Sequence, residues 1–336
     1  MSKMSSDLVR YALNGPTMGT RWSALFHMPP GFDVACITAA MQAAVVEVDA
    51  QMSSWKPDSD LMRLNAAPQD VWVGVPLRLM AVLEAALDIG RASGGAFDIG
   101  VGDAVAAWGF GATKASAPNI RGVLGSARRP AYDVLELDPA NCRVSKHGPL
   151  TLDLSAIAKG YGVDRLAEVA AEFGVSGALV AIDGELRATG LQPDGVAWNV
   201  AIERPDHMAR APHSVLALHD AAVATSGDYR HWVEVGGRKL SHTMDPTRGG
   251  PLAVSPASVT VVARTCMAAD AWATALMVRR SLEGAELARR YNIDALFIDR
   301  EGDHLLETRV GRLFENRPPR ALSSTRGFTT DESFAS

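Results

Sequence analysis

Apolar side chains recur at helical spacing in two long segments of the chain. In residues 33–52, one stripe holds the apolar positions Val34, Ile37, Met41, Ala44, Val45 and Val48. Asp33 precedes this stripe and is placed to cap the first turn of a helix. Residues 77–92 have the pattern of a second helix, and Gly94 and Gly95 follow it, as glycine often does where a helix ends. We therefore expect a helix in each segment.

Shorter apolar runs predict strands. Continuous β-branched runs at residues 178–183 and 257–263 are typical of buried strands. Residues 294–309 predict a hairpin that turns at Glu301, Gly302 and Asp303. Because helices and strands mix without a strict β-α-β alternation, the pattern favours an α+β fold class, with mixed β-sheets and helices packed against them.

The composition is that of a globular protein. The chain has 336 residues, of which 47% are hydrophobic and 21% charged. The body contains no repeat or linker, so we expect one domain over residues 1–315. Residues 316–336 are rich in Pro, Ser and Thr and predict a largely disordered tail.

Charge and cysteine usage narrow the range of partners. The net charge of −5 disfavours nucleic acid as a partner, because phosphate backbones need a basic surface. Cys36, Cys142 and Cys266 lie far apart without CxxC spacing, which disfavours a disulfide framework or a zinc site. Residues 1–15 lack the apolar core of a signal peptide, and no run approaches the length of a membrane helix. We therefore expect a cytoplasmic protein without a membrane span.

Residues 152–174 are the first segment with candidate chemistry. Ser155 is placed to cap a helix that ends at Gly174, and its start holds Ala156, Lys159 and Gly160. Small residues let a ligand approach the backbone, and free amides with a lysine at a helix start suit a phosphate. On this segment alone, a capped surface helix with a solvated lysine is the better-supported interpretation.

Two further segments carry polar groups near turns. Asp183, Gly184 and Glu185 end one predicted strand and begin another, and a plain Asp-Gly hairpin is the favoured interpretation of this segment alone. The second segment, which contains Thr225, Ser226 and Gly227, offers hydroxyls and backbone amides.

His242 is a candidate general base, because Asp245 follows it closely and a histidine near a carboxylate can accept a proton near neutral pH. A hydrogen-bonded histidine at a strand end is about equally well supported by this stretch alone.

The segment MAADAWATALMV, residues 267–278, predicts an almost wholly apolar helix that Thr265 caps. Asp270 and Thr274 interrupt it and lie on one face, one turn apart. A carboxylate in such a helix needs a partner, and Mg²⁺ holding a pyrophosphate is one candidate, because Mg²⁺ prefers hard oxygen ligands. The other candidate is an arginine or backbone amides, since Arg264 and Arg279 are near in sequence.

Taken together, these segments resemble the ApbE family, the FAD:protein FMN transferases. The resemblance covers residues 17–275 in the order of the family's motifs. The matching stretches are TMGTRW from Thr17, MSSWKPDSDLMRLN from Met52, SGGAFDIGVGDAVAAWGFG from Ser93, DLSAIAKGYGVD from Asp153, WNVAIERP from Trp198, TSGDY from Thr225, SHTMDP from Ser241 and ADAWATA from Ala269.

The resemblance implies a reaction and a fold. FAD and Mg²⁺ would bind, the pyrophosphate would be cut, FMN would be joined through its phosphate to a Thr or Ser of an acceptor flavoprotein, and AMP would leave. FAD would lie in a cleft between a main lobe and a smaller lobe. The same residues would also serve an FAD diphosphatase that releases FMN and AMP, and a flavin-binding protein without catalysis is the rival from another class.

The resemblance also implies residue roles. Asp270 and Thr274 would be side-chain ligands of Mg²⁺, and the backbone carbonyl of Ala156 a third ligand. His242 would activate the incoming hydroxyl, with Asp270 as the second catalytic residue. The residues implied to contact FAD are Met18, Gly19, Trp55, Asp98, Lys159, Asp183, Gly184, Glu185, Thr225, Ser226, Gly227 and His242. Trp55 would stand where the family often has a tyrosine against the isoalloxazine ring.

The chain departs from the family pattern in its turns. After the His-x-x-Asp-Pro motif the family usually has Arg-Thr-Gly, whereas this chain has Thr247, Arg248 and Gly249. The stretch IDGEL, which contains Asp183, replaces a more usual Gly-Gly-Asp. These are the positions at which family roles transfer least directly.

Overall fold

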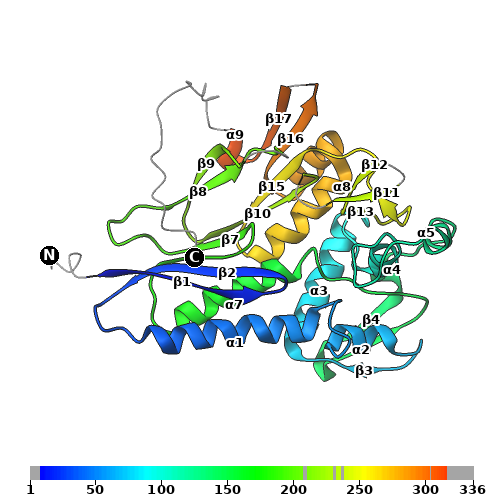
Figure 1. The fold of residues 1–336 in the computed structure, drawn as a ribbon, viewed down its shortest axis with the longest axis horizontal. Helices are drawn as coiled ribbons and strands as arrows, with labels where there is room; N and C mark the ends of the chain where they lie inside the picture. The colour runs from blue at the N-terminus through cyan, green and yellow to red at the C-terminus, as the bar shows by residue number, and fades with distance from the viewer. Residues whose placement is uncertain (1–7, 207–209, 230–231, 236–237, 303, 316–336) are drawn as a thin grey trace.

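The protein is built around one large antiparallel sheet, shown in the computed structural model of Figure 1. The structure describes residues 8–206, 210–229, 232–235, 238–302 and 304–315. In spatial order, the eight strands of the main sheet are β1 (Val9–Thr17), β2 (Thr20–Met28), β6 (Ala178–Ile182), β7 (Glu185–Thr189), β10 (Ala221–Gly227), β15 (Ser258–Ala263), β16 (Asp294–Glu301) and β17 (His304–Val310). Each neighbouring pair is antiparallel.

Three long helices cover one face of this sheet. They are α1 (Val34–Met52), α7 (Ala158–Glu172) and α8 (Cys266–Arg290), and Figure 1 shows α7 and α8 running beside the strands with α1 beyond α7. The α1 stripe from Ile37 to Val48 is buried, together with Trp22 and Phe26 of β2. Burying these apolar faces stabilises the layered arrangement.

A small hairpin covers part of the other face. It consists of β8 (Trp198–Glu203) and β9 (Pro212–Leu218), and the helix α9 (Arg312–Glu315) lies beside it. Trp198, Ile202 and Leu216 alternate with exposed positions and pack against the sheet with Phe314. The sheet is therefore buried on both faces in this region.

A smaller lobe, at the right of Figure 1, follows the end of α1 and shares its core with Val48 and Met52 of that helix. Its helical elements are α2 (Asp60–Ala66), α3 (Leu77–Ala92), the 3-10 turn η1 (Ile99–Val101), α4 (Gly102–Ala107), α5 (Ala117–Leu124), α6 (Ala131–Val134) and the 3-10 turn η2 (Pro139–Asn141). A three-stranded sheet joins β3 (Val73–Gly74), β5 (Arg143–Lys146) and β4 (Leu135–Asp138). Leu79, Leu83 and Phe97 are among the residues of its core.

Two short hairpins lie between the lobes. The first pairs β11 (Trp232–Val235) with β12 (Arg238–Ser241), and the second pairs β13 (Met244–Asp245) with β14 (Gly250–Pro251). The α5 helix packs against the second hairpin, because the side chains of Val123 and Leu124 lie against Gly249 and Gly250.

The structure confirms most of the predicted elements. Asp33 caps α1 by accepting a hydrogen bond from the Cys36 amide, and α3 spans the predicted range. The predicted strands are β6 and β15, and the terminal hairpin is β16–β17, although its turn residue Asp303 lies outside the described residues. The α+β class is confirmed, because helices and sheets combine in this fold. Within the sheets, the described strand pairs are antiparallel.

One helix start was predicted wrongly. The α7 helix begins at Ala158 without a side-chain cap, and Ser155 does not cap it. The carboxylate of Asp153 accepts a hydrogen bond from the Ser155 amide at 2.9 Å, and the carbonyl of Leu154 accepts from Ile157 and Ala158. This extra turn separates Ser155 from the helix. The predicted tail at 316–336 lies outside the described residues.

The α1 helix also qualifies the expectation about membranes. Among the described residues, it is the one helix long and apolar enough to cross a bilayer by length and composition. A single such helix is weak evidence, because a core helix of a soluble protein passes the same test. Its apolar stripe packs against β2 and α7 in this fold.

Candidate functional site

A cavity of about 870 Å³ lies between one end of the main sheet, the first turns of α7 and α8, and the smaller lobe. It contains every residue for which the sequence implied a role: Met18, Gly19, Trp55, Asp98, Ala156, Lys159, Asp183, Gly184, Glu185, Thr225, Ser226, Gly227, His242, Asp270 and Thr274. The fold thus brings residues from distant parts of the chain together around one cavity.

Two neighbouring hairpin turns form the sheet side of the cavity. Met18 and Gly19 connect β1 to β2, and Asp183 and Gly184 connect β6 to β7. Met18, Gly19 and Asp183 adopt positive φ values of 45°, 72° and 53°, a conformation that tight turns require and that side chains other than glycine rarely adopt. Because β2 pairs with β6, both turns lie at the same end of the sheet. The Asp-Gly hairpin was predicted correctly, and it also lines the cavity.

A buried ionic cluster lies behind the second turn. The Lys159 ammonium donates to Oε1 of Glu185 at 2.8 Å and lies 3.9 Å from Oδ2 of Asp183. The side chain of Glu185 is only 5% exposed, and its Oε2 atom is buried without a hydrogen-bond partner. A buried carboxylate oxygen without a partner is costly, so this cluster is incomplete by itself.

Asp270 enters the same cluster from α8. Its Oδ2 atom accepts a hydrogen bond from the Gly160 amide at 3.0 Å, in the first turn of α7. The close approach of the two helices requires glycine there, because a side chain at position 160 would collide with the backbone of Cys266. One turn along α8, the Thr274 hydroxyl lies 3.2 Å from the hydroxyl of Ser226.

The pKa values in this cluster reflect burial and crowding of carboxylates. Burial raises the pKa of Asp270 to about 7, Glu185 adds to the rise, and Lys159 and the Gly160 amide oppose it. Burial also raises the pKa of Glu185, against the attraction of Lys159. Burial alone would lower the pKa of Lys159, but the surrounding carboxylates outweigh it and raise that pKa. One ammonium therefore only partly compensates the carboxylates around it.

The arginines that could have paired with Asp270 lie elsewhere. Arg279 donates to the carbonyls of Ser93 and Gly94 at 2.8 and 2.9 Å. Arg264 lines a second, smaller cavity of about 380 Å³ with Arg187 and Asp220. The structure thus disfavours an arginine as the reason for the buried carboxylate.

The donor set fits a hard cation such as Mg²⁺. Asp270 supplies a carboxylate and Thr274 a hydroxyl, and Ala156 lines the same cavity with its backbone carbonyl as the implied third ligand. The orphaned Oε2 of Glu185 and the raised pKa of Asp270 both indicate negative charge that lacks a counter-charge. In the described part of the chain, His, Cys, Asp and Glu do not gather in groups of three or more that could hold a metal ion. A cation here would therefore need hydroxyl, carbonyl or ligand oxygens as well.

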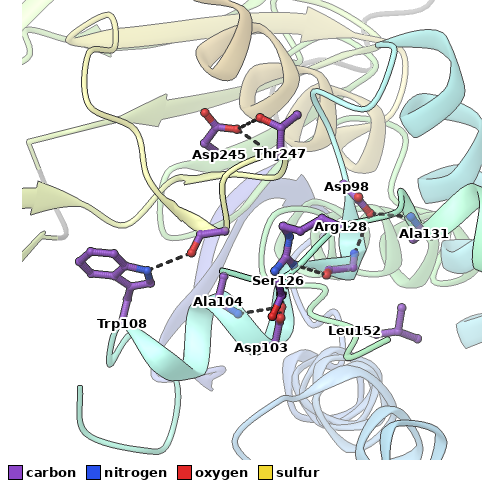
Figure 2. A network of polar contacts seen from close by, with 12 residues as sticks. Asp98, Asp103, Ala104, Trp108, Ser126, Arg128, Ala131, Leu152, Asp245 and Thr247 are labelled. Atoms are coloured by element: carbon purple, nitrogen blue, oxygen red, sulfur yellow. Dashed lines mark hydrogen bonds and ion pairs between the residues drawn. The ribbon is translucent and has the colours of Figure 1, made fainter. Parts of the chain in front are cut away.

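The segment that carries His242 lines the same cavity. The His242 ring packs edge-on against Phe110, with 6.5 Å between the ring centroids. The carboxylate oxygen Oδ1 of Asp245 accepts from the amide and hydroxyl of Thr247 at 3.0 and 2.6 Å, and from the amide of Arg248. Figure 2 shows the contact between Asp245 and Thr247. Asp245 thus caps the turn at residues 247–249, in which this chain departs from the family pattern.

Asp98 stands on the smaller-lobe side. Its Oδ1 atom accepts hydrogen bonds from the amides of Gly100 at 2.8 Å and Ala131 at 3.1 Å. Burial raises the pKa of Asp98, and these two amides and the charge of Arg128 oppose the rise. Trp55 borders the cavity with 60% of its surface exposed, which leaves its indole free to stack on a planar ligand.

Several lining residues had no role in the sequence analysis. They include Asp153, Val105, Phe110, Glu203 and Arg210. Val105 and Phe110 lie within the matched stretch from Ser93, and Glu203 lies within the stretch from Trp198, so the motif boundaries could have indicated them. Arg210 lies between matched stretches, where the sequence carries no signal.

Comparisons with known proteins find similar sequences over most of the chain. A model described as the ApbE family matches residues 18–297. An FAD:protein FMN transferase of Vibrio cholerae is 36% identical over 299 residues, covering 88% of this chain and 89% of that protein. One from Escherichia coli K12 is 33% identical, covering 87% and 84%.

Solved structures show the same fold. The flavin transferase ApbE from Vibrio cholerae has a TM-score of 0.80 and 33% identity, covering 90% of this chain and 97% of that one. The apo form of the flavinyl transferase ApbE from Pseudomonas stutzeri also has a TM-score of 0.80 and 33% identity, covering 92% and 96%.

Proposed function

The chain belongs to the ApbE family and is a transferase, and we propose that it cleaves FAD with Mg²⁺ and attaches FMN by a phosphoester bond to a Thr or Ser of an acceptor flavoprotein, with release of AMP. The relatives that it matches over most of its length are named FAD:protein FMN transferases. The observation that carries the proposal is the cavity, which joins a partly compensated buried carboxylate cluster to an exposed tryptophan.

The chain's own residues would bind and orient the two substrates. Asp270, Thr274 and the Ala156 carbonyl would hold Mg²⁺, which when bound would neutralise charge that develops on the diphosphate. Lys159 adds a fixed positive charge on the same side, held in place by Glu185. Phosphoryl transfer depends mainly on such positioning and charge neutralisation.

His242 would accept the proton of the incoming hydroxyl. It lines the same cavity as the carboxylate cluster, and its ring packs against Phe110. Trp55 and the Met18–Gly19 turn would contact the flavin, while Thr225, Ser226 and Gly227 would contact phosphate or adenosine. The Thr225 hydroxyl already bonds Thr260 at 2.8 Å, so its backbone and its neighbour Ser226 are the better contacts.

The test combines an acceptor assay with metal removal. The full-length protein is incubated with FAD and Mg²⁺, with and without a Thr-containing acceptor domain, while AMP, free FMN and acceptor mass are followed. We expect AMP release together with an FMN-sized mass gain on the acceptor, and loss of both with a chelator. AMP with only free FMN would instead identify an FAD diphosphatase. FAD that binds and stays intact would identify a binding protein and contradict the proposal.

A further inference from the structure

The carboxylate of Asp98 is fixed on one side and open on the other. Its Oδ1 atom accepts both amide hydrogen bonds, from Gly100 and Ala131. Its Oδ2 atom makes no hydrogen bond to any residue in the ranges that the structure describes, although Asp98 lines the cavity. A ligand in the cavity would therefore meet a carboxylate whose orientation is set in advance.

Arg128 stands behind this carboxylate and outside the cavity lining. Its guanidinium binds both oxygens of Asp103, at 2.9 and 2.7 Å, and also donates to the carbonyl of Gly100 at 2.9 Å (Figure 2). The side chain is only 11% exposed. Bidentate pairing by a guanidinium fixes direction as well as distance, so Arg128 defines where the Gly100 carbonyl lies.

Gly100 joins the two interactions in one residue. Its amide donates to Asp98, and its carbonyl accepts from Arg128. The turn also lies tightly against residues 150–153, because a side chain at position 100 would come within 2.8 Å of Leu150. The Gly102 amide donates to Thr151 at 2.9 Å, and the Asp153 amide donates to Ile99 at 2.8 Å. A shift of the Gly100 backbone would therefore move Asp98 relative to the cavity.

The same segment also contacts the turn that follows His242 in the chain. Trp108 follows α4 and donates through its indole nitrogen to the carbonyl of Gly249 at 3.0 Å (Figure 2). Gly249 belongs to the turn that Asp245 caps. Arg128 thus fixes one end of a segment whose other end touches the His242 side of the cavity.

We propose that Arg128 is a positioning residue for substrate binding: through the backbone of Gly100 it holds the Asp98 carboxylate in the orientation that a hydrogen-bond donor of the bound FAD requires. The inference rests on the proposed function, because it takes FAD as the occupant of the cavity. Arg129 is the matched control. It is the adjacent arginine, it donates to the carbonyl of Asp133 at 3.1 Å, and it does not line the cavity.

The experiment is a double-mutant cycle on FAD affinity, measured by fluorescence titration of the full chain. We expect Arg128→Met and Asp98→Asn each to raise the Kd for FAD about tenfold, as loss of a charged hydrogen bond does. Because both act through one contact, the double variant should bind no more than about twofold worse than either single variant. Arg129→Met should bind like the wild type.

Independent effects would overturn the inference. If the two substitutions multiply to about a hundredfold, or if Arg128→Met binds FAD normally, Arg128 does not act through Asp98. Should Arg128→Met fail to fold, as judged by circular dichroism, Arg128→Lys takes its place, since an ammonium cannot reproduce the planar fork. Arg128→Lys with wild-type affinity would also overturn it. A wild-type protein that does not bind FAD would instead overturn the proposed function.

Discussion

The two ends of the cavity hold their carboxylates in opposite ways. At the helix end, Asp270 accepts from the Gly160 amide, and burial beside Glu185 raises its pKa to about 7. At the smaller-lobe end, Asp98 receives two amides, and a guanidinium locks the peptide behind it. The first carboxylate is only partly compensated by Lys159, whereas the second is held in a fixed orientation.

This difference separates two tasks. A carboxylate that awaits a counter-charge is suited to a cation that arrives with the substrate. A carboxylate that is already oriented is suited to recognising a fixed donor group. We therefore expect changes at the helix end to affect turnover, and changes at the smaller-lobe end to affect affinity and stability.

The largest effect is expected for Asp270→Asn. The amide keeps the shape and can still accept from Gly160, but it removes the charge that would bind Mg²⁺. Metal-dependent FAD turnover should fall by about a hundredfold or more, while FAD binding is retained. Steady-state AMP release and fluorescence titration would measure the two quantities.

Asp299→Asn is the control for that substitution. Asp299 contacts the same helix through Ser281 at 2.5 Å, but it does not line the cavity. We expect this variant to turn over FAD at the wild-type rate. Full activity in Asp270→Asn would contradict the expectation that the helix end serves turnover.

The next largest effect concerns Asn65, which supports the smaller-lobe end. Its side chain donates to the carbonyl of Leu152 at 2.9 Å and accepts from the Leu152 amide at 2.7 Å. Asn65→Ala should lower the free energy of unfolding by about 2 kcal/mol, because both backbone groups lose their partner. Urea denaturation would measure this loss. Asn141→Ala, at an exposed turn, should change stability by less than about 0.5 kcal/mol.

A smaller effect is expected for Trp55→Ala. The exposed indole can gain stacking energy only when a planar ligand is present, so the Kd for FAD should rise about threefold to tenfold. Fluorescence titration measures this change. Trp72 provides the comparison, because its ring stacks on Arg143 at 4.7 Å and does not line the cavity. Equal affinities of Trp55→Ala and wild type would show that the flavin lies elsewhere.

The smallest effect is a pH dependence at the far side of the smaller lobe. Hydrogen bonds to Asp70 at 2.7 Å and Glu136 at 2.6 Å raise the pKa of His147 above 6.5. The protonated form is thus stabilised in the folded state. Its contribution is fully present below the ordinary pKa and is lost as the pH rises through the raised one.

Melting temperatures of wild type and His147→Gln, compared across that pH window, would measure this contribution. The difference between the two proteins should be greatest at the acidic side and vanish at the basic side. A difference that does not change with pH would contradict the assignment. FAD affinity should be unaffected, because His147 does not line the cavity.

Sequence reasoning identified the regular elements well, because periodic burial leaves a periodic pattern. The α1 stripe, the α3 range and the Thr265 cap of α8 were all predicted in this way. Asp270, at the helix end of the cavity, could also be singled out from the sequence, since a carboxylate within an apolar helix is conspicuous. The α7 start was not, because Ser155 has the identity of a cap while Asp153 takes its amide.

The smaller-lobe end was harder to predict. β3 has 2 residues, and β4 and β5 have 4 each, which is too short to show a period. Arg128 lies in an irregular stretch and acts through contacts with Gly100 and Asp103, far back in the chain. Such contacts depend on how loops meet in space, and a local pattern does not record them. The single domain over residues 1–315 and the residue roles implied by the family stay predictions.

Because β2 pairs with β6, the main sheet cannot form in full until the ribosome has made the β6 segment. Phe26 lies opposite Ala178, so the first hairpin leaves the ribosome long before its neighbour in the sheet exists. At typical elongation rates the wait is on the order of ten seconds. Throughout that time Trp22 and Phe26, both buried in the finished fold, lack the cover that α7 and β6 provide. Chaperone dependence of the newly made chain should therefore be concentrated in its first half.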